Sequence, residues 1–320
     1  MLEDYKNALR AGQRATRAAQ ARGQSPYLAV LDDILRGVNI VAQEPLGLVD
    51  IPAESIVGTK TAGRHTAFAP NFMPLLEGDS EFAHKWSNLC DAHLEEGIRN
   101  PITAYEYLNK FYVEEGNKRV SVLKYYEAVK IPGTVTRLVP ERNETLENKI
   151  YYEFLDFYKL SKINYVHFSR LGGYAKLQTL VCKATGESWT DDDRLNFASL
   201  YTMFSQQFYA LGGSALGLTP GDALLVYLAV YRYSDAIEST PAQVRENLSK
   251  LWDEIKILTR PQAVELQLEP ATKQGAEPLL SKLNIFSPRP SELRVVLLHE
   301  HNAQTSAWVR GQDKGRDALL

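Results

Sequence analysis

A short run of residues, Glu115-Gly116-Asn117-Lys118-Arg119, places a glycine, an amide and two cations at one point of the chain. Apolar residues recur at helical spacing from Val120 to Val129, which predicts that a helix begins at this run. A glycine lets the backbone approach a ligand closely, and the first amides of a helix point positive dipole at an anion. Basic residues in a first helical turn are disfavoured by that dipole unless an anion is bound. The run therefore predicts a phosphate site.

Three assignments around this run stay open on the sequence. A solvated turn with two surface cations would give the same pattern, because motifs of this length have a high false-positive rate. Glu115 precedes the glycine and is a candidate catalytic base, although acidic residues are common where strands end. Arg64 lies upstream in a stretch rich in Gly, Pro and Thr. It is either a second phosphate-contacting arginine or a solvated loop side chain.

The elements that must hold the run have the order strand, turn, helix, strand. Two strand-like segments, Ile102–Leu108 and Phe111–Glu114, meet at Asn109-Lys110 and predict a hairpin directly before the turn. After the helix, Ile131-Pro132-Gly133 is expected to close the element before a strand over 134–139. Upstream we expect a strand over 46–56, a loop over 58–74, and a helix that begins at the N-cap Ser80 and ends at Gly97. Together these segments predict a small α/β unit.

Helical patterns dominate the rest of the chain. A basic, Ala-rich helix is expected over 2–21, on a surface or against a partner, and a second helix through Ile34. Beyond Pro140 five helices are expected, over 144–160, 174–184, 191–211, 220–233 and 241–258. The last three have a threonine at the N-cap position, namely Thr190, Thr219 and Thr240. Aromatic residues recur at helical spacing within 151–158 and 197–208 and are expected to be core, so this half predicts a helical bundle.

The ordered spacing of these motifs resembles the ParB/sulfiredoxin superfamily. Gly97-Ile98-Arg99-Asn100-Pro101-Ile102 precedes the hairpin, Glu115-Gly116-Asn117-Lys118-Arg119-Val120 follows it, and a short helix then leads to a strand. Members of the superfamily share a Gly-x-x-x-Pro-Ile segment and a Gly-x-x-Arg phosphate turn in this order. The resemblance covers residues 46–140. It implies that Gly116, Asn117, Lys118 and Arg119 bind a nucleotide phosphate, with Arg64 as the upstream contact.

Departures from the superfamily narrow the chemistry. Sulfiredoxins carry a cysteine inside the turn, and this turn has none, which argues against sulfinic acid reduction. Serine kinases of the superfamily have an acidic residue just before the glycine, and Glu115 matches it. Partition proteins place a helix-turn-helix after this domain, but no helix with a basic face stands out here. DNA binding through phosphates needs several convergent cations, so DNA is the less favoured partner.

A second resemblance concerns the last 30 residues. The apolar, β-branched run Leu293–Leu298, followed by Trp308 and by a Gly-x-x-x-Gly at Gly311 and Gly315, is similar to the opening of the basic-membrane-protein family. That family comprises periplasmic-binding folds of the purine-nucleoside receptor type. The resemblance implies the first strand and helix of a longer domain. The alternative is that the run adds an edge strand to the preceding domain.

Composition bounds the remaining classes. The formal net charge of -3 gives no global attraction to DNA or to an anionic membrane. The cysteines, Cys90 and Cys182, lie on helical apolar patterns and are expected to be buried free thiols. Neither a secretory leader nor a spanning helix is visible, so a cytoplasmic location is expected. His299 and His301 do not have the spacing of a helical zinc site, and no metal site is expected.

The expected fold is α+β and helix-rich, with a small ParB/sulfiredoxin-like α/β domain and a helical bundle domain. Its expected parts are N-terminal helices (1–45), the ParB/sulfiredoxin-like domain (46–140), the helical domain (141–260), a linker (261–290) and the incomplete start of a basic-membrane-protein-like domain (291–320).

The expected function is that of a nucleotide-phosphate-binding regulatory or sensing module, and the second resemblance implies that it belongs to a protein of the basic-membrane-protein family, which is nucleoside receptor-like. A non-enzymatic role is expected. Its ligand would be CTP, ATP or ADP with Mg²⁺, or a nucleoside, and the chain could form a homodimer. The alternatives are a weak nucleotide hydrolase or small-molecule kinase using Glu115, and a ParB-like DNA-associated protein.

Overall fold

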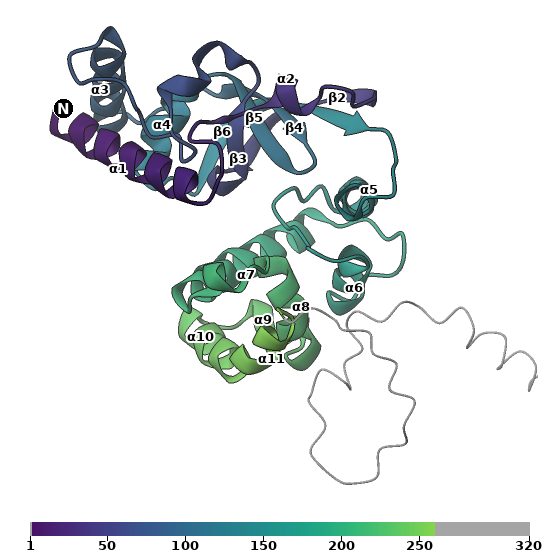
Figure 1. Ribbon diagram of the computed structural model, residues 1–320. Helices are drawn as coiled ribbons and strands as arrows, with labels where there is room; N and C mark the ends of the chain where they lie inside the picture. Colours follow the sequence, from purple (N-terminus) through teal and green to yellow (C-terminus); the bar gives the residue numbers. More distant parts are fainter. Residues whose placement is uncertain (1, 260–320) are drawn as a thin grey trace, which may run out of the picture. The chain divides into compact units, whose positions relative to one another are not determined.

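The computed structural model describes residues 2–259, which belong to one compact unit. Figure 1 shows a sheet with helices in the first 140 residues and helices alone after them. The chain is therefore a mixed α/β, helix-rich protein, as expected. The expected linker over 261–290 and the receptor-like segment over 291–320 lie outside the described residues. The domain boundary expected at residue 140 stays a prediction.

Six strands form one mixed sheet in the order β1-β3-β5-β4-β6-β2. The strands are β1 (Ala29–Val30), β2 (Ile40–Pro52), β3 (Ile56–Thr59), β4 (Ile102–Tyr107), β5 (Lys110–Glu115) and β6 (Lys130–Pro140). β4 and β5 form the expected antiparallel hairpin, in which Tyr107 pairs with Lys110. β5 is also parallel to β3, while β4 is parallel to β6. Because β5 has a neighbour on each side, the turn that follows it starts from a fixed base.

The last strand of the sheet begins earlier than the sequence indicated. Ile131, Pro132 and Gly133 were expected to end an element, but they lie inside β6 and pair with β2. A side chain at Gly133 would lie 2.6 Å from Ile51 Cδ1 and 3.0 Å from Ile102 Cγ1. The glycine therefore makes room for two core side chains from the neighbouring strands and does not stop the strand.

Other boundaries differ in the first half of the chain. β2 runs over Ile40–Pro52, and not over 46–56. The stretch expected as a loop over 58–74 contains the end of β3 and a 3₁₀ helix, η2 (Ala62–Ala67), after the shorter η1 (Ala53–Ser55). The second helix, α2, is confined to Leu31–Ile34. Thr and Gly in these segments suggested irregular structure, but sheet pairing overrides that local preference.

Three helices cover the sheet region near the turn: α1 (Leu2–Ala21), α3 (Glu81–Glu95) and α4 (Asn117–Tyr125). Ser80 caps α3 as expected, because its side chain accepts a hydrogen bond from the Ala83 amide. Tyr5 of α1, Trp86 of α3 and Val122 of α4 meet in one buried cluster. The Trp86 indole donates a hydrogen bond of 2.8 Å to Ser121 Oγ on α4. These contacts fix the orientation of α4.

The second half of the described chain is helical. Its helices are α5 (Leu146–Ser161), α6 (Gly173–Leu180), α7 (Asp191–Ala210), η3 (Gly213–Leu216), α8 (Pro220–Val230), α9 (Tyr233–Ile237), α10 (Pro241–Lys250) and α11 (Trp252–Ile257). Thr190, Thr219 and Thr240 each form a capping box, as their positions predicted. The helix expected over 241–258 is interrupted at Leu251. Within residues 2–259, no helix combines the length and apolar character needed to cross a membrane.

The aromatic stripes are core, and one of the two cysteine assignments is wrong. Tyr151, Phe154, Phe197 and Phe204 are buried, as their helical spacing predicted. Cys90 is a buried free thiol, but Cys182 is a free thiol on the surface. α6 ends at Leu180, so Cys182 lies in the turn after the helix, where its φ is +61°. The apolar pattern continued past the point at which the helix ends.

A buried ion pair joins β4 to β6. Glu106 and Arg137 stand opposite each other on the two strands, and both are almost fully buried. The Glu106 carboxylate accepts hydrogen bonds from Arg137, from the Tyr151 hydroxyl at 3.1 Å and from the Asn109 amide at 2.7 Å. Burial raises the pKa of Glu106, although Arg137 opposes that shift. Neither Glu106 nor Arg137 was singled out from the sequence.

A buried histidine makes the stability of the fold depend on pH. Both ring nitrogens of His167 are buried without a partner among the described residues, and burial lowers the pKa of the ring to about 4. The unfolded chain binds this proton near pH 6.5, so it binds more protons than the folded chain between about pH 6.5 and 4. We therefore expect the free energy of unfolding to decrease as the pH is lowered from about 6.5 to 4. The contribution of His167 to this decrease is at most about 3 kcal/mol.

The measurement is urea unfolding of His167→Gln across this pH range, with His84→Gln as the matched exposed histidine. His167→Gln should flatten the dependence on pH, and His84→Gln should leave it as in the parent chain. Equal slopes in the parent chain and His167→Gln would contradict the assignment.

Candidate phosphate-binding site

The turn between β5 and α4 adopts a conformation that only glycine fits. Gly116 has φ +109° and ψ +19°, in the left-handed region. A Cβ at this position would lie 2.8 Å from Ile102 Cγ2 and 3.2 Å from Arg119 Nε. The Val120 amide donates to the Gly116 carbonyl at 3.0 Å. The amides of residues 117–119 precede this hydrogen bond, so they are the free N-terminal donors of α4.

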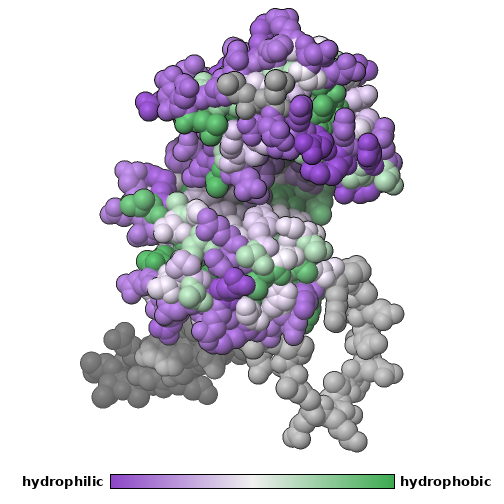
Figure 2. Space-filling view, turned by 90° about the vertical axis from the view of Figure 1, so that its left-hand side faces the viewer, coloured by the Kyte–Doolittle hydropathy of each residue, from purple (hydrophilic) through white to green (hydrophobic). Residues whose placement is uncertain are grey.

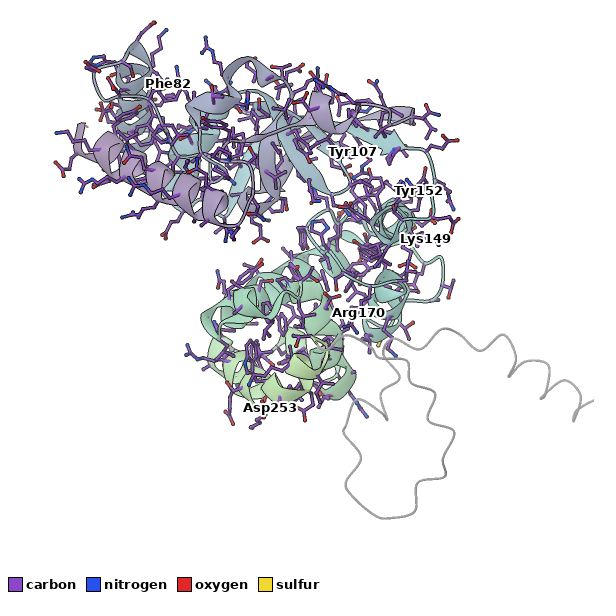
Figure 3. All side chains as sticks on the ribbon, in the orientation of Figure 1. Phe82, Tyr107, Lys149, Tyr152, Arg170 and Asp253 are labelled. Atoms are coloured by element: carbon purple, nitrogen blue, oxygen red, sulfur yellow. The ribbon has the colours of Figure 1, made fainter. Side chains whose placement is uncertain are left out.

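The structure brings all six predicted site residues to one hollow of about 370 Å³. Its lining consists of Arg64, Phe68, Phe82, Glu114, Glu115, Gly116, Asn117, Lys118 and Arg119. Arg64 reaches it from η2, which is far from the turn in sequence. Phe82, labelled in Figure 3, reaches it from the first turn of α3. The site is therefore assembled from four elements, β5, α4, η2 and α3.

Lys118 and Arg64 lie close enough to repel each other and form what we call the cationic corner of the hollow. Burial lowers the pKa of Lys118, and repulsion from Arg64 and Lys85 lowers it further, while Glu81 opposes the shift. Within the described residues, ion pairs involve neither Lys118 nor Arg64. Lys118 Nζ instead lies 4.7 Å from the centroid of the Phe82 ring. An anion bound here would relieve the repulsion between these cations.

Arg119 holds the turn in place. Its guanidinium donates hydrogen bonds of 3.1 Å and 2.5 Å to the carbonyls of Asn100 and Pro101. It also forms an ion pair of 3.1 Å with Glu115. These contacts tie the turn to the segment before β4. Several of its N–H groups are therefore already used within the protein, and the predicted contact of Arg119 with a phosphate stays a prediction.

Asn117 places a buried side-chain oxygen at the turn, and among the described residues no group donates a hydrogen bond to it. Its side-chain nitrogen donates to Thr59 Oγ1 at 3.2 Å, and Thr59 in turn donates to the Val113 carbonyl at 3.0 Å. The Asn117 side-chain oxygen is buried and has no hydrogen-bond partner among the described residues. A buried polar atom without a partner is costly, so this oxygen is suited to a ligand group that can donate a hydrogen bond.

Glu115 lies on the rim of the hollow. About three quarters of its side chain is exposed (77%), and its carboxylate is paired with Arg119 four residues later. Its catalytic role stays a prediction.

If a nucleotide binds at this hollow, its Mg²⁺ would be held mainly through the nucleotide phosphates. Among residues 2–259, no group of three or more His, Cys, Asp or Glu side chains is placed to bind a metal ion. Mg²⁺ commonly binds through one or two carboxylates, substrate phosphates and water. The side chains of Glu114 and Glu115 and the unpartnered oxygen of Asn117 line the hollow and are compatible with that mode.

Several residues of the site were not found from the sequence. Phe68, Phe82 and Thr59 were not singled out, and the carbonyls of Asn100 and Pro101 were noted only as part of a motif. Phe82 and Phe68 pack edge to face with ring centroids 5.3 Å apart, which ties α3 to the segment after η2. The only sequence signal for Phe82 was its place in the first turn of a capped helix.

Comparisons with known proteins assign this chain to no family. No family model matches the chain, and no curated protein matches it. The class that fold and site define is a mixed α/β protein with a cationic hollow at a strand-to-helix turn.

Proposed function

We propose that this chain binds the phosphate groups of a nucleotide at the Gly116 turn and acts as a ligand-sensing module. The observation that carries the proposal is the convergence of Lys118, Arg64 and the free amides of α4 on one hollow. Helix N-termini of this kind bind phosphate through backbone N–H groups and the helix dipole. The resemblance of residues 46–140 to the ParB/sulfiredoxin superfamily supports the same function.

The size and chemistry of the hollow favour a nucleotide over a nucleoside. A volume of about 370 Å³ lies within the range of small-ligand sites, and the cations Arg64 and Lys118 are among its lining residues. The proposed ligands are CTP, ATP or ADP with Mg²⁺. A nucleoside lacks the charge that the cationic corner would neutralise, so adenosine serves as the negative control.

A conformational change caused by ligand binding at the Gly116 turn is proposed to reach the helical region through the sheet. α5 contacts the sheet through the Tyr151 hydroxyl, which donates to Glu106 on β4. β4 is also the strand beside β5, from which the phosphate turn starts. A change at the turn therefore has a direct path of bonded neighbours to α5.

The test is calorimetric titration of the full chain with CTP, ATP, ADP and adenosine in Mg²⁺. We expect binding of at least one nucleotide and none of adenosine. Lys118→Met should weaken the nucleotide about 10- to 100-fold, since a hydrogen bond to a charged group contributes about 1.5 to 3 kcal/mol. Lys159→Met, which removes an exposed lysine of α5, should leave the affinity unchanged. Absence of binding with every nucleotide would overturn the proposal.

A further inference from the structure

The exposed face of α1 carries a row of cations. Lys6, Arg10, Arg14 and Arg17 are all exposed, and their spacing of four, four and three residues keeps them within an arc of about 80°. Arg22 follows just after the helix ends. The row, defined as these four residues of α1, lies on an element separate from the lining of the Gly116 hollow.

The row is held on a rigid support. On the opposite face of α1, Tyr5 and Ala8 are completely buried. The Tyr5 ring packs edge to face on Trp86, with centroids 5.5 Å apart, and its hydroxyl donates to the Leu76 carbonyl at 2.7 Å. A Cβ at Gly12 would collide with the carbonyl of Pro74, so α1 lies directly against that backbone. The cations are therefore presented at fixed spacing.

The charge of the row is largely uncompensated. Among the described residues, its one ion pair joins Arg10 to Glu3 at 3.9 Å, and both side chains are mostly exposed. The whole chain has a formal net charge of -3, so the positive charge is a local property of this helix. A row of this kind favours an anionic partner with regularly spaced charges.

The dimensions of the row match one strand of a nucleic-acid duplex. From Lys6 to Arg17 the helix rises by about 17 Å. A duplex strand carries one phosphate per 3.4 Å of axis, so this length faces about five phosphates.

An anionic membrane fits less well, because interfacial helices insert an apolar face, and the apolar face of α1 is buried. No large apolar side chain of α1 is exposed within the described residues, and the molecular face on which α1 begins is mainly hydrophilic (Figure 2).

We infer that the row on α1 binds the phosphate backbone of duplex nucleic acid without reading its sequence. Each phosphate neutralised releases counterions, so affinity falls with salt at a slope of about -0.9 per contact. Four contacts give a slope of about -3 to -4 when the logarithm of the association constant is plotted against the logarithm of the salt concentration. This inference does not rest on nucleotide binding at Gly116.

The experiment is fluorescence anisotropy of labelled DNA and RNA duplexes of unrelated sequences with the full chain, between about 50 and 200 mM salt. We expect retention at low salt, independent of sequence. The Arg14→Gln/Arg17→Gln variant should reduce the slope by about 2. The matched control, Arg245→Gln/Lys250→Gln, removes two exposed cations from α10 and should keep the slope of the parent chain.

Two further arms locate the binding. Lys118→Met should bind the duplex with the affinity of the parent chain. A loss of affinity in that variant would place the contact at the Gly116 turn and overturn the inference. Vesicles of anionic phospholipid should not compete. Binding to vesicles with no binding to a duplex would assign the row to a membrane and overturn the inference, as would equal slopes in the two double variants.

Discussion

Replacing Arg137 with methionine should lower the free energy of unfolding by about 3 to 5 kcal/mol. The substitution leaves the Glu106 carboxylate buried in the sheet without its cation. The Tyr151 hydroxyl and the Asn109 amide still donate to it, but neither carries the compensating charge. Methionine fills much of the volume of the arginine stem, so the loss comes mainly from Glu106, which must either stay charged without its cation or take up a proton. Urea unfolding of the full chain measures it.

The loss should depend on pH with a definite sign. Burial already raises the pKa of Glu106 in the folded chain, and Arg137 holds that shift back. Without Arg137 the folded pKa rises further, so Glu106 keeps a proton that the unfolded chain has released. A group with a raised folded pKa contributes its stability below the unfolded pKa and loses it as pH rises. Arg137→Met should therefore be nearest to the parent chain at about pH 4.5 and below.

Two controls test whether the loss of stability comes from the burial of Glu106 or from breaking any ion pair. Glu106→Gln in the Arg137→Met background removes the unpaired charge and should restore part of the stability. Lys110→Met breaks the exposed ion pair of Lys110 and Glu147, and should cost about 1 kcal/mol or less. If Lys110→Met were as destabilising as Arg137→Met, the account of Glu106 would be wrong.

The second large effect is expected at the turn. Gly116→Ala should reduce nucleotide affinity more than tenfold, because its Cβ meets Ile102 and Arg119 and its φ of +109° is unfavourable for alanine. The backbone would relax by moving the first amides of α4, which are the proposed phosphate donors. Calorimetric titration with the nucleotide that the parent chain binds gives the affinity.

The matched control is Gly37→Ala. Gly37 also has a positive φ, +77°, but no atom lies within 4 Å of the position of its Cβ. It should therefore cost about 1 to 2 kcal/mol of stability through the backbone alone, with unchanged nucleotide affinity. If Gly116→Ala kept the affinity of the parent chain, the turn would not be the phosphate site.

The elements beside the site could be predicted because their signals are local. The hairpin of β4 and β5 follows from two strand-like segments and a short turn, and α4 from apolar spacing after Gly116. Ser80 and Thr190 each cap a helix through a hydrogen bond that spans three residues. Nucleotide binding itself stays a prediction of the sequence, and the structure adds the geometry that makes it testable.

The rest could not be predicted because it depends on residues distant in the chain. Arg119 acquires two of its acceptors from a segment 18 and 19 residues away, and these contacts hold the turn in place. Glu106 and Arg137 are opposite each other only in the register of β4 and β6. Gly133 looks like a strand stop until Ile51 and Ile102 are placed beside it. The residues next to each position in the sequence do not indicate which distant residues will pack against it.

The hydrogen bond from Trp86 to Ser121 gives the molecule a built-in optical reporter. Indole emission is sensitive to the polarity and hydrogen bonding around the ring, and this ring is completely buried between α1, α3 and α4. Ser121 is four residues along the helix from Asn117 at the turn. Small movements of α4 are therefore expected to change the emission of Trp86, which is one of the four tryptophans of the chain.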